Sequence, residues 1–217
     1  MVSLTVENYV KAIYLICARS GGQPAATGQV AAALDVSPGT VTSMLKTLAE
    51  SNLVTYTPYE GVRLTGAGRA LALRILRRHR LIELFLSKTL QLSWDEVHDE
   101  AEHMEHAVSD LLIDRIDAYL DYPESDPHGD PIPKADGTVR ASTTRTLADC
   151  QSGQRFRLTR VLDQSPDFLR YLSETGLELG TEGELLSNRP EAGVIAVRVG
   201  HTEATLGREA AAKLLVE

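Results

Sequence analysis

The sequence contains little cysteine, few aromatic residues and no long hydrophobic run. Cys17 and Cys150 are the two cysteines of 217 residues, which argues against a disulfide framework and against a thiolate metal cluster. No apolar segment approaches the roughly 18 residues that a membrane-spanning helix requires. The first residues also lack the basic and apolar regions of a secretion signal. These absences predict a globular, cytoplasmic protein without a membrane partner.

Positive charge is scarce overall, but it is concentrated near the N-terminus. The formal net charge is −8. Residues 1–80 contain nine Lys and Arg and four acidic residues, so they carry +5 and the remainder carries −13. A basic region joined to an acidic one is typical of a protein that meets nucleic-acid phosphates through one domain.

The N-terminal third has the pattern of a winged helix-turn-helix. An amphipathic helix is expected over residues 6–17, followed by a short helix over 28–34 that Thr27 caps. Ser37 is predicted to cap a third helix, with Pro38 at its first position, where the missing N–H costs nothing. Two helices joined by so short a turn form a helix-turn-helix, although such a unit can also be mere packing.

The predicted DNA contacts lie on the third helix and on a following hairpin, the wing. This hairpin is expected from strands at 53–56 and 62–65, with its turn at Glu60-Gly61. Small polar groups with one cation suit a helix that enters the major groove, because bulk would block its approach. The candidate DNA contacts are Thr27, Ser37, Pro38, Gly39, Thr40, Thr42, Ser43, Lys46 and Arg63.

Histidines and carboxylates gather in the middle third. His79 and Glu83 lie one turn apart on a helix expected over 68–90, and Ser93 with Glu96 forms a capping box that opens the next helix. Carboxylates at the edge of a core are costly unless they are paired or bind metal. On that next helix, an arc of about 100° is predicted to hold four further donors. They are His98, Glu102, Glu105 and His106.

The sequence allows two interpretations of this helix. Its remaining acidic residues and His103 fit an ordinary solvated face. The two donor sets on adjacent helices favour a metal site instead. Oxygen and nitrogen donors without sulfur suit Mn²⁺, Fe²⁺, Co²⁺ or Zn²⁺ rather than Cu⁺.

Three segments, 77–83, 97–110 and 126–133, resemble the diphtheria toxin repressor family of metal-dependent regulators. The resemblance covers the whole chain. It implies a homodimer that binds operator DNA and represses metal-uptake genes when metal is bound. It also implies a mainly α fold with a small β domain: a winged helix at 1–72, a helical dimerisation and metal-binding domain at 73–122, a linker at 123–144, and an SH3-like (FeoA-like) β-barrel at 145–217.

The resemblance also assigns metal ligands. Its primary site falls on Glu102, Glu105 and His106, with Asn8 from the first helix. Glu102 stands where the iron-responsive branch has Cys, so a hard carboxylate replaces a soft thiolate and the chain is similar to the manganese-responsive branch. Asn8 departs from the Asp usual in manganese regulators, and Lys11 departs from the Glu of the single-domain ones. The implied metal is Mn²⁺, with Fe²⁺ as the alternative and Co²⁺, Ni²⁺, Zn²⁺ or Cd²⁺ as surrogates.

The family's ancillary site implies a second ligand set of His79, Glu83 and His98. Further ligands are expected at Asp126, His128 and Asp163, with Gln164 or Asp167 as alternatives to Asp163. For Asp126 and His128 an ordinary Asp- and Pro-rich loop is an equally good interpretation.

The C-terminal third alternates like a β domain. Strands are expected at 155–162 and 194–199, and a short helix at 165–174. Two other functions are alternatives for the whole chain, a metal-independent winged-helix regulator and a helical-bundle metalloenzyme. The second needs paired Glu-x-x-His motifs, and only Glu100 with His103 has that spacing, away from the donor arc. No enzyme activity and no small organic substrate are therefore expected.

Overall fold

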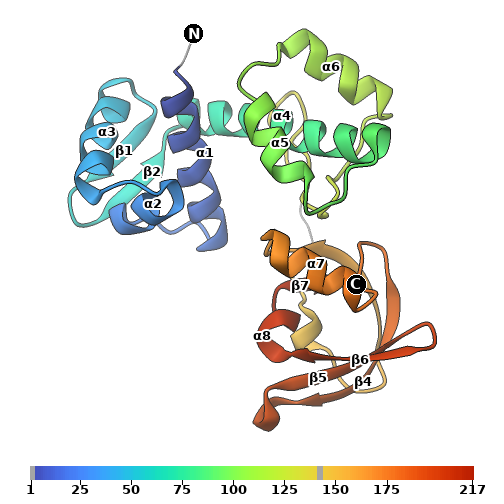
Figure 1. Cartoon of the computed structure of the whole chain (residues 1–217). Helices are drawn as coiled ribbons and strands as arrows, with labels where there is room; N and C mark the ends of the chain where they lie inside the picture. The colour runs from blue at the N-terminus through green and yellow to red at the C-terminus, as the bar shows by residue number, and fades with distance from the viewer. Residues whose placement is uncertain (1–2, 141–143) are drawn as a thin grey trace. The chain divides into compact units, whose positions relative to one another are not determined.

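The structure is a computed structural model that describes residues 3–140 and 144–217 (Figure 1). The chain divides into two compact units, Met1–Arg78 with Pro133–Thr138, and His79–Ile132 with Val139–Glu217. Residues 1–2, at the start of the chain where a secretion signal was sought, and residues 141–143 of the predicted linker lie outside the described part. Among the described residues, no helix combines the length and the hydropathy that a membrane span requires.

The first unit has the expected helix-turn-helix followed by a hairpin. Its elements are α1 (Leu4–Arg19), α2 (Thr27–Leu34), α3 (Pro38–Glu50), β1 (Val54–Thr57), β2 (Gly61–Leu64) and the first half of α4 (Gly66–Leu90). Their apolar faces meet in one core that includes the fully buried Ile13, Leu45, Leu48 and Val62. As predicted, the Ser37 hydroxyl accepts from the Thr40 N–H at the start of α3, and Pro38 follows it.

Two local details of this unit differ from expectation. Thr27 does not cap α2, because it lies inside the helix; the cap is Ala26, whose N–H donates to the Gln29 side chain at 2.9 Å. Each strand of the wing begins and ends one residue away from its predicted position. Tyr59 lies in the turn between the strands, with φ 70°. A side chain at Gly61 would come within 2.7 Å of the Ala25 carbonyl oxygen, so glycine lets β2 pair closely with the segment before α2.

The helical part of the second unit comprises the second half of α4, α5 (Val97–Met104) and α6 (Asp110–Tyr119). They enclose a core that includes Leu81, Ile82, Val97 and Ile113. The prediction of one helix running past His106 is wrong: α5 ends at Met104, and Ser109 caps a separate α6. The Glu96 side chain accepts from the Ser93 N–H at 3.0 Å, but it closes a turn before α5 rather than the first turn of the helix.

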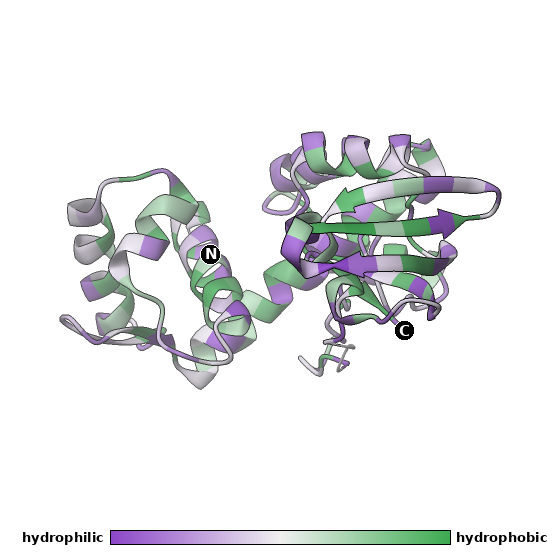
Figure 2. Cartoon of the chain, turned by 90° about the horizontal axis from the view of Figure 1, so that it is seen from below, coloured by the Kyte–Doolittle hydropathy of each residue, from purple (hydrophilic) through white to green (hydrophobic). Residues whose placement is uncertain are grey.

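The C-terminal part of the second unit is a five-stranded antiparallel sheet of order β6-β5-β4-β3-β7. Its strands carry hydrophobic stretches interrupted by hydrophilic residues (Figure 2). The strand expected at 194–199 is confirmed, as are the strand and the helix predicted near residues 155–162 and 165–174. The elements are β3 (Arg155–Val161), α7 (Pro166–Glu174), β4 (Glu182–Arg189), β5 (Val194–Val199), β6 (Thr202–Gly207), α8 (Arg208–Ala211) and β7 (Leu214–Val216).

The first half of the predicted linker is an ordered loop against β3. The Val161 N–H donates to the His128 carbonyl at 2.9 Å. Gly129 has φ +84°, and a side chain there would come within 2.1 Å of the Thr159 carbonyl oxygen. Only glycine fits both this backbone conformation and this close approach. The loop at residues 126–130 is therefore held in place from the side of the sheet.

Candidate metal centre

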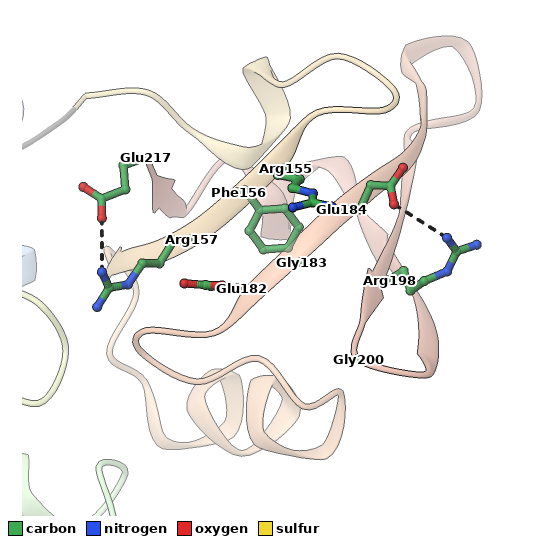
Figure 3. Close-up of a pocket in the computed structure, with 9 residues that line it drawn as sticks. All are labelled: Arg155, Phe156, Arg157, Glu182, Gly183, Glu184, Arg198, Gly200 and Glu217. Carbon is green, nitrogen blue, oxygen red and sulfur yellow. Dashed lines mark ion pairs between the residues drawn. The ribbon is translucent and has the colours of Figure 1, made fainter.

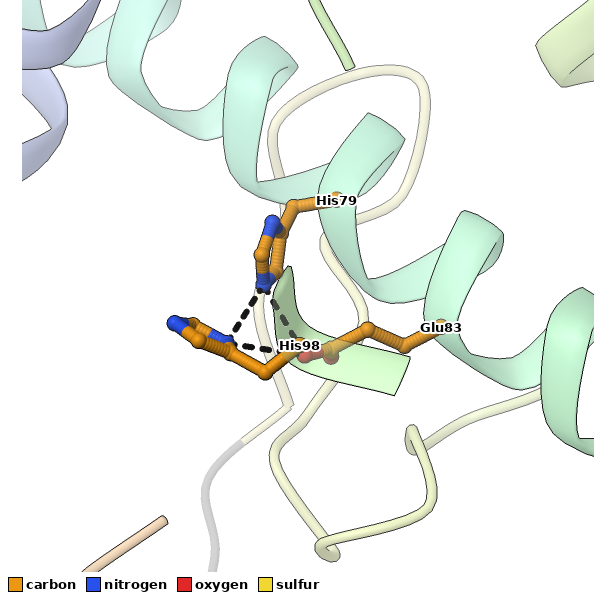
Figure 4. Close-up of side chains that lie close together, drawn as sticks. All are labelled: His79, Glu83 and His98. Carbon is orange, nitrogen blue, oxygen red and sulfur yellow. Dashed lines mark hydrogen bonds and ion pairs between the residues drawn. The ribbon is translucent and has the colours of Figure 1, made fainter. Parts of the chain in front are cut away.

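Helix α4 places His79 and Glu83 one turn apart, and both are buried. His79 Nε2 lies 2.9 Å from Glu83 Oε1. His98 enters from α5, and its Nδ1 lies 3.2 Å from each of these two atoms (Figure 4). One carboxylate oxygen and two imidazole nitrogens thus converge, as the spacing of the two helices predicted.

The other ring nitrogen of His79 faces a second set of donors. His79 Nδ1 lies 2.7 Å from Glu105 Oε2 and 3.7 Å from Glu102 Oε1. The second oxygen of Glu105 lies 3.2 Å from His106 Nε2. Glu105 is completely buried, so its carboxylate sits between two imidazoles with no exposure to solvent. His79 therefore connects the two predicted ligand groups.

The second oxygen of Glu83 faces the 126–130 loop. Glu83 Oε2 lies 3.9 Å from His128 Nδ1, which lies 4.0 Å from Asp126 Oδ1. Glu83, Asp126 and His128 are all buried and offer ligand atoms within 4.8 Å of one another. Asp126 Oδ1 also accepts from the N–H groups of His128 and Asp130, at 2.8 and 2.9 Å, which shapes the loop.

The charges of this cluster are unbalanced. Burial would raise the pKa of Glu83, but the imidazoles of His79 and His98 hold that pKa well below its usual range. Burial and the carboxylates of Glu83 and Asp130 raise the pKa of Asp126 well above its ordinary value, more than nearby Arg80 lowers it. The surroundings thus favour the charged form of Glu83 and the protonated form of Asp126. A divalent cation would supply the positive charge that lets Asp126 ionise as well.

The donor set fits a hard or borderline divalent metal. Its described members are carboxylate oxygens and imidazole nitrogens, which suit Mn²⁺ and Fe²⁺. Three buried candidate ligand atoms accept or donate no hydrogen bond among the described residues: His128 Nδ1, Asn8 Oδ1 and Asp126 Oδ2, the last of which lies 3.6 Å from Arg80 Nε. Buried lone pairs without partners are costly unless a cation or water takes them.

Models of known families match nearly the whole chain. The N-terminal DNA-binding domain of iron-dependent repressors matches residues 1–62, and their metal-binding and dimerisation domain matches residues 65–134. The FeoA domain matches residues 145–217. The chain belongs to the iron-dependent repressor family.

The proteins that are similar to this chain include both iron-dependent and manganese-dependent regulators. The iron-dependent repressor of Mycobacterium leprae is 28% identical over 98% of this chain and 96% of its own length. The diphtheria toxin repressor of Corynebacterium glutamicum is 29% identical over 85% of each chain. A manganese-dependent transcriptional repressor in complex with manganese is 40% identical, with a TM-score of 0.86 over 97% of this chain and 98% of that one.

These likenesses confirm the predicted family, the three-part fold and the function of a metal-dependent transcriptional repressor rather than an enzyme. A manganese-activated repressor, 33% identical in its apo form with a TM-score of 0.82 over 97% of this chain and 99% of that one, has also been solved with Zn²⁺ or Cd²⁺ bound. In this family, metals other than the activating one therefore occupy binding sites.

The structure brings most of the predicted donors of the second unit together, but it places three residues elsewhere. The Asp163 carboxylate accepts from Lys213 at 2.8 Å, and the amide of Gln164 donates to Asp130 at 3.0 Å. The Asp167 carboxylate pairs with Arg170 at 2.6 Å. Asn8 lies on α1 in the first unit and stays a predicted ligand.

The predicted DNA contacts differ in exposure. Six are exposed on and before α3, whereas Thr27 and Thr42 are half-buried. The Thr42 hydroxyl donates to the Pro38 carbonyl at 3.0 Å, so this hydroxyl is already used within the helix. Arg63 is exposed on the wing, and its guanidinium donates to the Gly22 carbonyl. The exposed six are Ser37, Pro38, Gly39, Thr40, Ser43 and Lys46.

Sequence reasoning missed the residues that anchor the 126–130 loop. Arg80 lies 3.6 Å from Asp126 and 3.3 Å from Asp130, and it donates to the Pro131 carbonyl at 2.6 Å. Arg160 pairs with Asp130 from β3. These partners are far apart in the sequence, and the only signal that could have found them is an arginine directly after His79 on a buried helix.

An open pocket of about 480 Å³ lies on the C-terminal sheet, and none of the candidate donors lines it (Figure 3). Its charged side chains largely pair with one another. Arg157 lies 3.6 Å from Glu217, and Arg198 lies 3.6 Å from Glu184. The balanced charges of this pocket favour no particular ligand.

Proposed function

We propose that this chain represses transcription in response to Mn²⁺ by binding operator DNA as a homodimer. The supporting observation is that Glu83 and Glu105, both buried, each contact two imidazoles in a donor set without sulfur. Glu102 adds a carboxylate where a thiolate would favour a softer metal. The manganese-dependent repressors among the similar structures support the same metal.

We assign the proposed ligands to two groups that meet at His79. Glu102, Glu105 and His106 form one group, to which the resemblance adds Asn8. The other group lies around Glu83 and consists of His79, His98, Asp126 and His128; Asp163 was predicted with it but pairs with Lys213. When bound, the metal supplies two positive charges that offset the buried carboxylates. The protein residues hold the donor atoms within reach beforehand, so little conformational entropy is lost on binding.

Helix α3 supports the proposal for DNA. Ser37, Gly39, Thr40 and Ser43 present small groups, and Lys46 adds one positive charge on the same exposed helix. Small side chains allow close approach to base edges, while Lys46 and the wing residue Arg63 suit phosphate. The linkage is reciprocal: if metal favours the DNA-binding state, DNA must tighten metal binding by the same factor.

The surface of α6 supports the homodimer. Leu111, Leu112 and Tyr119 are 70, 50 and 69% exposed, which is unusual for large apolar side chains on one short helix. The helix lies within the segment matched by the dimerisation domain model. Burial of this face against a second copy would place two copies of α3 on one DNA, as half-sites of a symmetric operator require.

The deciding experiment is DNA binding across a metal series. An operator is first selected from random sequence, in parallel with the Mn²⁺-loaded and the Fe²⁺-loaded protein, and fluorescence anisotropy then measures the Kd with Mn²⁺, Fe²⁺ or no metal. We expect the Kd to fall by about 100-fold or more with metal, a coupling within the range known for linked sites. An equal Kd with and without every metal would contradict the proposal. A response to Fe²⁺ alone would support the iron-dependent function suggested by the Mycobacterium relative.

A pair of variants shows whether the candidate centre carries the response. Glu105→Ala removes the carboxylate between His79 and His106, so it should abolish the metal effect on DNA binding. Glu100→Ala is the matched control, because Glu100 is an exposed acid on the same α5. Circular dichroism checks that both variants fold. Full Mn²⁺ response in Glu105→Ala would mean that the metal acts elsewhere.

A further inference from the structure

Trp94, the single tryptophan of the chain, links the helical part of the second unit to its C-terminal sheet. It lies in the turn between α4 and α5, close in sequence to the donor His98. Its half-buried indole nevertheless packs against the core of the C-terminal sheet, which includes Leu169 and Leu172 of α7. A side chain from the helical part thus packs against the hydrophobic core of the C-terminal sheet.

The donor His128 is held by Trp94. His128 Nε2 donates to the Trp94 carbonyl at 2.7 Å, and the two rings are nearly parallel, at 15° with centroids 6.4 Å apart. The backbone carbonyl of His128 accepts from Val161 of β3 at 2.9 Å. His128 is completely buried, so its ring has no room to reorient without displacing these partners.

The contact with Trp94 determines which nitrogen of His128 is available to a metal. A backbone carbonyl can only accept a hydrogen bond, so Nε2 carries the hydrogen. In the neutral ring, Nδ1 then carries the lone pair. Nδ1 has no hydrogen-bond partner among the described residues, and it faces Glu83 and Asp126. Metal-bound histidines are commonly oriented in this way by a carbonyl on their other nitrogen.

The segment that carries this carbonyl is itself attached to α7 at two points. Trp94 Nε1 donates to Ser173 Oγ at 3.0 Å. The neighbouring Asp95 accepts from Arg170 at 3.1 Å. A shift of α7 would therefore move the Trp94 carbonyl that orients His128. Conversely, a fixed His128 would favour the position of α7 in which Ser173 and Arg170 bind Trp94 and Asp95.

We propose that Trp94 is a positioning residue for the metal donor His128, and that its indole couples metal binding at this donor to helix α7 through Ser173. The inference rests on the proposed function, because it requires a metal to bind at Glu83, Asp126 and His128. A purely structural role for Trp94 in the C-terminal core predicts a different outcome. It would change the stability of the protein without changing the ring of His128 or its affinity for metal.

The test uses the full-length protein and Cd²⁺, which is diamagnetic and therefore suited to NMR. Histidine labelled with ¹⁵N reports the tautomer of each ring, and the His128 signals are assigned by their loss in His128→Gln. In the metal-free wild type we expect the Nε2–H tautomer at His128. Added ¹¹³Cd²⁺ should produce a coupling to Nδ1 of His128, and Trp94 fluorescence should change over the same range of Cd²⁺ concentration.

Three variants separate positioning from packing. Trp94→Phe retains an aromatic ring without the N–H donor, and Ser173→Ala removes the acceptor while keeping the tryptophan. Both should measurably weaken Cd²⁺ binding at His128, by less than the roughly tenfold loss that follows removal of a ligand's direct partner, because the backbone carbonyl of residue 94 remains. Ser152→Ala, an exposed serine in the same C-terminal part, is the control and should leave the affinity unchanged.

The outcomes distinguish this inference from the proposed function. A wild-type protein that binds neither Cd²⁺ nor Mn²⁺ in calorimetry would contradict the proposed function itself. Metal binding with a His128 ring in the Nδ1–H tautomer, or with unchanged affinity in both Trp94→Phe and Ser173→Ala, would overturn only the role of Trp94. Loss of affinity in these two variants, with Ser152→Ala unaffected, would support it.

Discussion

The helix-turn-helix and the candidate metal centre use polar side chains in opposite ways. On α3, Ser37 pairs with Thr40 and Thr42 pairs with Pro38, so each contact spans three or four residues. In the metal centre, His79 meets Glu105 across 26 residues of sequence, and His128 meets Trp94 across 34. The first surface is built by a local helix and stays exposed. The second depends on packing of α4, α5 and the 126–130 loop. A substitution in the metal centre is therefore expected to change both the free energy of unfolding and the affinity for metal.

The largest effect is expected at Glu83, where this dependence is strongest. Glu83→Gln removes the charge that both His79 and His98 contact, and breaking a buried pair costs about 3 kcal/mol or more. We expect the free energy of unfolding to fall by this amount, and the Mn²⁺ affinity to fall by about 100-fold or more, because Glu83 lies beside three other proposed donors, His79, His98 and His128. Urea denaturation and calorimetry measure the two quantities. Glu100→Gln, exposed on α5, should change neither, and a stable Glu83→Gln with normal Mn²⁺ affinity would refute the role of Glu83.

A smaller effect is expected at Asn8, which tests whether the two regions are chemically separate. Asn8→Asp replaces a neutral amide oxygen by a carboxylate, which binds hard cations more strongly. If Asn8 is a ligand, the Mn²⁺ affinity should rise by about tenfold, or about 1.4 kcal/mol. Calorimetric titration measures this change. Asn52→Asp adds the same charge to the exposed turn after α3 and should have no effect; equal affinities in both variants and the wild type would confine the metal centre to the second unit.

The smallest effect is expected at Ser37, which caps α3 and is also a predicted DNA contact. Ser37→Ala removes the hydroxyl that accepts from the Thr40 N–H at 3.2 Å, and loss of such a helix cap costs about 1 kcal/mol. Ser43→Ala, exposed on the same helix, removes a hydroxyl that caps nothing. We expect both variants to weaken DNA binding in anisotropy measurements, but only Ser37→Ala to lower the free energy of unfolding. Equal stabilities would mean that the cap contributes little.

The prediction of one arc of donors shows how far local reasoning extends. His98 and Glu102 are helix neighbours as expected, and Glu105 still has helical backbone angles at the end of α5. His106 lies beyond the helix, yet its Nε2 lies 3.2 Å from Oε1 of Glu105, its neighbour in the sequence. The structure thus gathers these predicted donors although they do not all lie on one helix, and their role as ligands stays a prediction. The sequence did not predict that His79 lies between Glu83 and Glu105. Helical periodicity gives the face of the helix on which a histidine lies, but not which of its ring nitrogens faces a neighbouring helix.

The sequence by itself determined the winged helix, the small C-terminal β domain, the family and the metal-donating residue types. It could do so because capping, periodicity and residue chemistry act over a few positions. The tertiary structure decided how the donors group. It placed Glu83 between His79 and His128, directed Asp163 to Lys213, and set Trp94 against the buried ring of His128. Apart from the pair of His79 and Glu83 on α4, these contacts join segments tens of residues apart, and only the packing of those segments selects among the partners that the sequence allows.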